Sequence, residues 1–131
     1  MAVDPLAGDL CDFLECRTDP ARFRHADHVR MAFAVLRLHG EFADAALIYS
    51  RALRAIAARA GQPGLYHDTI TFAFLSLIAE RMAAAPEAEF ESFAARNADL
   101  FDNSLLGRWY DSERLQLPLA RKTFLLPLRA P

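Results

Sequence analysis

Apolar side chains recur every three or four positions along most of this chain, which is the spacing that one face of an α-helix produces. The first such stretch begins at Asp4-Pro5, with proline in the first helical position, and Thr18-Asp19-Pro20 ends it. Its apolar face consists of Leu6, Leu10, Phe13 and Leu14. The pattern therefore opens with an amphipathic helix.

Two longer helices are predicted next, from about His25 to His39 and from Phe42 to Ala60. Each is followed by a glycine, Gly40 or Gly61, which is the residue type found most often just beyond a helix end. Gln62-Pro63-Gly64 then indicates a turn.

The fourth predicted helix, about Tyr66 to Ala84, is apolar around most of its circumference, which is typical of the buried centre of a bundle. Its apolar residues are Ile70, Phe72, Phe74, Leu75, Leu77 and Ile78. Pro86 is expected to open a fifth helix, with Glu87 and Glu89 near the positive end of its dipole. The core face of that helix consists of Phe90, Phe93 and Ala94.

Beyond Asn97 the periodicity weakens, and only short helical turns are predicted, at Leu105–Tyr110 and Ser112–Gln116. The tail is expected to be extended because prolines interrupt it, namely Pro118, Pro127 and Pro131. Its apolar side chains should pack along the bundle through Leu117, Leu119, Phe124 and Leu125. The pattern thus predicts an all-α fold, a compact bundle of about five main helices with an extended tail.

Composition agrees with this fold, because alanine is very common and β-branched residues are few. We expect one domain over residues 1–131, with 1–3 and 127–131 as flexible ends. The chain has 15 Lys+Arg against 17 Asp+Glu, a net charge of −2, which excludes the basic face that nucleic-acid binding requires. No apolar run reaches the roughly 18 residues of a membrane span.

The N-terminus has neither the basic region nor the apolar region of a secretory signal, so a cytoplasmic location is expected. Cys11 and Cys16 lie five residues apart on the first helix, which suits neither a zinc pair nor a local disulfide. Both are expected to be reduced.

The histidines carry the candidate chemistry. Helical spacing places His25 and His28 on or beside the apolar face of the second helix, and His67 opens an apolar stripe on the fourth, with Asp68 next to it. These four side chains converge only if the two helices run in the same direction, as in an up-down-up bundle. His39 lies about 16 Å further along its helix and is excluded from such a site.

Three kinds of site fit this cluster. His25, His28 and His67 would be three nitrogen ligands for a divalent metal, the one cofactor that the pattern suggests. Alternatively, a histidine oriented by Asp68 would transfer protons near neutral pH. An anion would bind at the start of the fourth helix with help from Arg22, Arg24 or Arg30. The remaining substrate-binding candidates are Tyr66 and Thr71.

Ordinary structural roles explain the same residues. An inward histidine at a helix start is often a capping or core residue, Asp68 suits the helix dipole, and Thr71 can bond the carbonyl of His67. The sequence cannot choose between these readings without the helix directions.

Two strings carry a resemblance: Phe23-Arg24-His25-Ala26-Asp27-His28-Val29-Arg30 and Tyr66-His67-Asp68-Thr69-Ile70-Thr71. They resemble a family of small uncharacterised bacterial helical proteins with an F-x-H-x-x-H string and a Y-H-E-T-I-T string. Asn97-Ala98-Asp99-Leu100 and Tyr110 are similar to its later segments. Asp68 departs from the glutamate of that pattern. The resemblance implies that both strings belong to one pattern, and it implies no activity.

We therefore expect a small soluble protein with a His-lined polar pocket at one end of the bundle. It would carry out acid/base or metal-assisted chemistry on a small anionic molecule, and His67→Ala would remove activity with little loss of fold. The alternative is a non-catalytic binding or interaction protein, a homodimer or a subunit of a larger enzyme, whose histidines are structural.

Overall fold

The computed structural model describes residues 5–128, and all regular elements within that range are helical. The α-helices are α1 Pro5–Leu14, α2 His25–Leu38, α3 Phe42–Arg59, α4 Asp68–Ala83, α5 Phe90–Arg96, α6 Ser112–Gln116 and α7 Pro118–Lys122. Short 3-10 turns join them: η1 Pro20–Arg22, η2 Pro63–Leu65, η3 Ala98–Phe101 and η4 Leu105–Arg108. The predicted all-α fold is confirmed. The flexible ends expected at 1–3 and 127–131 fall almost entirely outside the described residues.

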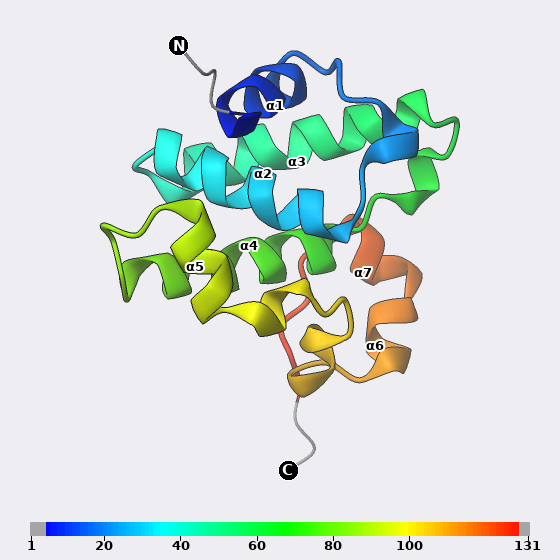
Figure 1. Cartoon of the computed structure of the whole chain (residues 1–131). Coiled ribbons are helices and arrows are strands. Elements are labelled where there is room, and N and C mark those ends of the chain that lie inside the picture. The colour runs from blue at the N-terminus through cyan, green and yellow to red at the C-terminus, as the bar shows by residue number, and fades with distance from the viewer. Residues whose placement is uncertain (1–4, 129–131) are drawn as a thin grey trace.

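The helix directions are those of an up-down-up arrangement. In Figure 1, α2 and α4 run in the same direction across the molecule. α3, which lies between them in the sequence, runs in the opposite direction. α2 contacts α1, α3 and α4, while α7 lies against α4 near the end where that helix begins. Within residues 5–128, no helix is both long and apolar enough to cross a bilayer.

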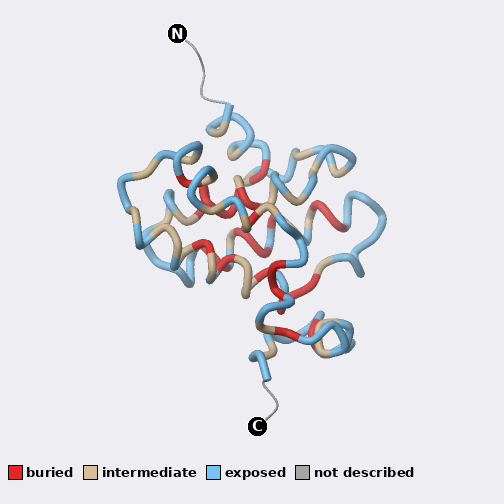
Figure 2. Tube along the Cα trace, turned by 60° about the horizontal axis from the view of Figure 1, so that its bottom comes forward, coloured by how far each residue is buried: buried red, intermediate tan, exposed pale blue. Residues whose placement is uncertain are grey.

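The core lies where α1 to α5 face one another, and Figure 2 shows buried positions gathered there with exposed stretches around them. Its largest fully buried side chains include Phe13, Phe33, Phe93, Met31, Leu75 and Ile78. Burial of each such side chain contributes about 1.5–3 kcal/mol to folding. Alanines on α3 let the neighbouring helices approach closely, since Ala45, Ala46, Ala52 and Ala57 are all buried.

The fourth helix is less central than its apolar composition predicts. Leu75 and Ile78 are buried, but Ile70 is 39% exposed and Phe74 only half-buried. The longest buried run instead lies on α2, over 31–35. The reason is that one side of α4 borders a cavity and the C-terminal segment rather than another long helix.

Several predicted helix ends shift. α2 ends at Leu38 and Gly40 does not take a left-handed conformation, so it is not the predicted terminating glycine. Gly61 does have that role: its φ is 73° and Gln62 N–H donates to Ala57 O at 3.0 Å, closing the end of α3. Pro86 precedes a turn, and α5 begins only at Phe90.

The tail is not extended throughout, which corrects the prediction. Pro118 occupies the first position of α7, where its missing N–H costs nothing, and it therefore opens a helix instead of preventing one. From Pro118 onward, only residues 123–128 of the described tail lack regular structure.

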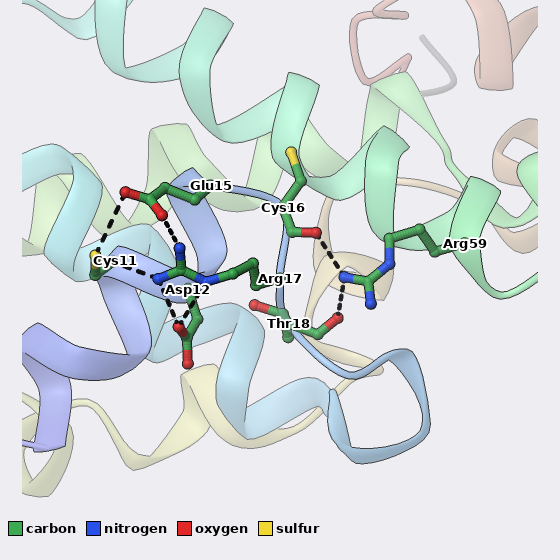
Figure 3. A network of polar contacts seen from close by, with 7 residues as sticks. All are labelled: Cys11, Asp12, Glu15, Cys16, Arg17, Thr18 and Arg59. Carbon is green, nitrogen blue, oxygen red and sulfur yellow. Dashed lines mark hydrogen bonds and ion pairs between the residues drawn. The ribbon is translucent and has the colours of Figure 1, made fainter.

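α1 ends in a cap that normally holds glycine. Cys16 has a φ of 59°, Arg17 N–H donates to Asp12 O at 2.7 Å, and Cys16 N–H donates to Phe13 O at 3.2 Å. Figure 3 shows the Arg17 guanidinium folded back onto Asp12, and Arg59 donating to the backbone carbonyl of Cys16. Cys11 and Cys16 are both free and exposed.

Cys16→Gly is expected to stabilise the protein by about 0.5–1 kcal/mol, because glycine adopts the left-handed conformation without the Cβ clash that cysteine suffers. Urea unfolding followed by circular dichroism measures the change. Cys11→Gly is the matched control: it places glycine inside α1 and is expected to destabilise. If the Cys16→Gly protein were less stable than the wild type, the left-handed conformation of Cys16 would not be strained.

Candidate functional site

A cavity of about 490 Å³ lies at the end of the bundle where α2 and α4 begin and α3 ends. Most of its wall is apolar or aromatic, and the larger side chains are Phe23, Leu53, Ile56, Leu65, Ile70, Phe74 and Ile78. Its polar lining consists of His25, His28, Tyr49, Tyr66, His67, Thr71 and Asn103. The parallel α2 and α4 thus bring the three predicted histidines to one cavity, whereas Asp68 does not line it.

His67 is held as a structural residue. It precedes α4 as its N-cap, with Nδ1 accepting the N–H of Ile70 at 3.1 Å, and the residue is 7% exposed. Nε2 lies 2.7 Å from Leu115 O, and since a carbonyl only accepts, Nε2 carries the proton. Both ring nitrogens of a neutral imidazole are therefore occupied. These two hydrogen bonds are those of a capping residue, and the catalytic role expected for His67 stays a prediction.

Asp68 belongs to a second polar group beside the cavity. One carboxylate oxygen pairs with Arg54 at 3.2 Å, and the Asp68 side chain is 10% exposed. The Arg54 guanidinium also stacks on the Tyr66 ring, 4.7 Å from its centroid. Burial, and secondarily Asp68, raises the pKa of Tyr66, so this phenol stays neutral. Asp68 does not orient any of the three histidines through a hydrogen bond.

His25 starts α2 and faces the cavity with one nitrogen committed. Nε2 lies 2.9 Å from Leu100 O and must donate to it, which leaves Nδ1 as an acceptor in the neutral ring. The ring also meets Phe74 edge-on, with centroids 5.2 Å apart. His25 thereby joins the start of α2 to η3 and α4.

His28 is the least constrained histidine of the cavity. Its ring packs against Phe23 at 4.6 Å and His25 at 6.3 Å between centroids, and within residues 5–128 it makes no side-chain hydrogen bond. Burial, and secondarily the charge of His25, lowers the pKa of His28 to about 4, while Asp27 opposes this weakly. His28 is therefore neutral at neutral pH.

The metal site expected from His25, His28 and His67 does not form in this structure. Among the described residues, no three His, Cys, Asp or Glu side chains are grouped so that they could hold a metal ion. The physical reason is local. Both ring nitrogens of His67 are hydrogen-bonded, to Ile70 and Leu115, and one ring nitrogen of His25 is hydrogen-bonded to Leu100.

The arginines expected beside an anion lie elsewhere. Arg30 pairs with Asp9 at 3.0 Å and with Asp27 at 3.5 Å, and neither Arg24 nor Arg30 lines the cavity. Arg30 lies two residues after His28, so its side chain points about 200° around the helix from that of His28. At the start of α4, His67 already accepts an N–H that an anion would need.

Two residues of the Tyr-His-Asp-Thr string, His67 and Thr69, anchor the C-terminal segment, a role that the sequence did not reveal. Thr69 is fully buried; its hydroxyl accepts the N–H of Leu125 at 3.0 Å and lies 2.8 Å from the carbonyl of Ala120. Tyr110 adds a hydrogen bond to Leu125 O at 2.7 Å. The only signal in the sequence was a polar residue inside an apolar helix, and its partners lie about fifty residues away.

Comparison with protein-family models, with curated proteins and with solved structures finds no match for this chain. The resemblance to small bacterial helical proteins therefore stays a prediction, and the functional argument rests on the cavity alone.

Proposed function

We propose that this protein binds a small molecule in the cavity between the start of α2, the start of α4 and the end of α3. The observation that carries the proposal is a cavity of about 490 Å³, a volume typical of ligand sites, with a mostly apolar wall. A single imidazole in that wall, His28, is left without a protein hydrogen bond in the described structure. Apolar walls with one or two free polar groups bind ligands by burial and orient them by hydrogen bonds.

Acid/base catalysis has less support from the same geometry. A general base works best with a pKa near the working pH, and the pKa of His28 lies at about 4. His67 has no free nitrogen with which to accept or deliver a proton. Binding without chemistry, the alternative drawn from the sequence, is therefore the function we put first.

Filling the cavity should abolish binding. Ala57 lines the cavity and Ala58 is exposed on the same helix, so Ala57→Phe and Ala58→Phe are a matched pair. We expect the neutral fluorescent probe N-phenyl-1-naphthylamine to bind the wild type and Ala58→Phe alike, and Ala57→Phe at least about tenfold more weakly. Fluorescence titration measures the affinities, and circular dichroism checks that both variants fold. Equal binding by both variants would place the probe outside this cavity.

A second candidate is an interaction protein. Apolar side chains are exposed over the last helices and the tail, at Leu117, Leu119, Phe124, Leu126 and Leu128, each at least 42% exposed. Exposed apolar side chains mark an interface where they form one contiguous patch. Homodimer formation thus stays a prediction, for which sedimentation equilibrium of the whole chain is the measurement.

A further inference from the structure

We infer that the ligand of this cavity is an uncharged aromatic or alicyclic alcohol whose hydroxyl forms a hydrogen bond with His28. This inference rests on the proposed function and adds the chemical class of the ligand. Three features of the cavity carry it: its charge, its walls and the imidazole of His28, which has no hydrogen-bond partner in the described structure.

The cavity has no charge with which to balance an ionic ligand. None of its lining residues is Asp, Glu, Lys or Arg. Arg54, which contacts the lining residue Tyr66, is already paired with Asp68 and stacked on the Tyr66 ring. A charged ligand would lose its hydration without gaining a counter-charge, and such burial is strongly unfavourable. We therefore expect an uncharged ligand here in place of the small anion predicted from the sequence.

The walls favour a flat or ring-shaped apolar body. Phe23 packs on His28, and Phe74 meets His25, so two aromatic side chains line the same end as the histidines. Leu53, Ile56 and Ile78 complete the apolar wall. Rings bury a large area here and meet aromatic edges in favourable geometries.

His28 supplies the polar contact. In residues 5–128, the hydroxyl of Tyr66, which also lines the cavity, is the only fully buried side-chain polar atom without a hydrogen bond. The ring nitrogens of His28 have no hydrogen bond either, so they are not fully buried and can be reached from the cavity. The neutral imidazole has one acceptor nitrogen and one N–H donor. An alcohol matches it, because a hydroxyl both donates and accepts. A hydrocarbon of the same shape would leave His28 unpaired.

Three naphthalene compounds separate the contributions. We expect 2-naphthol to bind the wild type about tenfold more tightly than naphthalene, and 2-naphthoate to bind more weakly than either. In His28→Phe the advantage of 2-naphthol over naphthalene should fall below about threefold, and in His28→Gln, which keeps an uncharged donor and acceptor, it should largely return. Displacement of N-phenyl-1-naphthylamine measures all three compounds on all three proteins.

The outcomes distinguish failure of the ligand class and the role of His28 from failure of the cavity as a binding site. If naphthalene binds but 2-naphthol gains nothing, or if the gain survives in His28→Phe, the role of His28 is wrong while the cavity remains a binding site. Tightest binding by 2-naphthoate overturns the uncharged class. If neither the naphthalene compounds nor the fluorescent probe bind the wild type, the proposed function fails together with this inference.

Discussion

Replacing His67 with alanine is expected to lower the free energy of unfolding by about 2–4 kcal/mol. The buried imidazole caps α4 by accepting the N–H of Ile70, and it donates to Leu115 O in the C-terminal segment. Alanine leaves both backbone groups without a partner in a largely buried place, and it also leaves a small void. Urea unfolding followed by circular dichroism measures the loss.

Two variants keep this experiment interpretable. His39→Ala removes a histidine whose side chain makes no hydrogen bond or ring contact in the described structure, and it is expected to change stability by less than about 0.5 kcal/mol. His67→Asn retains a side-chain acceptor for the helix cap but loses the bond to Leu115, so it should recover part of the loss. If His67→Ala is as stable as His39→Ala, His67 is not structural and a role in chemistry becomes the better explanation.

Acidification from pH 6.5 to 4 is expected to cost about 3 kcal/mol of stability through His28 alone. In the unfolded chain this imidazole takes up a proton near pH 6.5, whereas burial and His25 lower its pKa in the folded protein to about 4. Between these values the unfolded state binds more protons, so falling pH favours unfolding. The contribution is complete above pH 6.5, and it has been lost below pH 4, where both states are protonated.

The comparison with His28→Phe isolates this contribution. Carboxylates also titrate in acid, but they are common to both proteins, including Asp27, which opposes the shift of His28. Unfolding free energies of both proteins at pH 7 and pH 4.5 are the measurement, and the wild type should lose about 2–3 kcal/mol more than the variant. Parallel pH profiles would mean that His28 is hydrated in the folded protein.

The roles of the histidines show where prediction from sequence stops. Helical spacing places His25, His28 and His67 at the starts of apolar stripes, and the parallel course of α2 and α4 brings them to one cavity. Their hydrogen bonds are a separate matter. The partners are backbone carbonyls of Leu100 and Leu115, and any residue type offers a carbonyl, so no pattern of letters marks those two positions.

The Tyr-His-Asp-Thr string also shows that hydrogen-bond partners could not be predicted from the sequence. Read alone, a histidine beside a carboxylate suggests a proton-transfer pair. In the fold, Asp68 turns to Arg54 and Thr69 binds the backbone near Leu125, so neighbours in the sequence serve different contacts. Successive residues at a helix start point about 100° apart, so residues that are adjacent in this string do not form one site.

What the sequence determined by itself is the all-α fold and the approximate course of its longer helices, because periodicity and turn residues act over a few positions. It also placed Gly61 at a helix end, since a positive φ is a local requirement. Only the tertiary structure decided that both ring nitrogens of His67 are hydrogen-bonded and that His28 has no hydrogen-bond partner in an uncharged cavity. Those outcomes depend on which distant backbone groups and side chains meet, and this is set by packing of the whole chain.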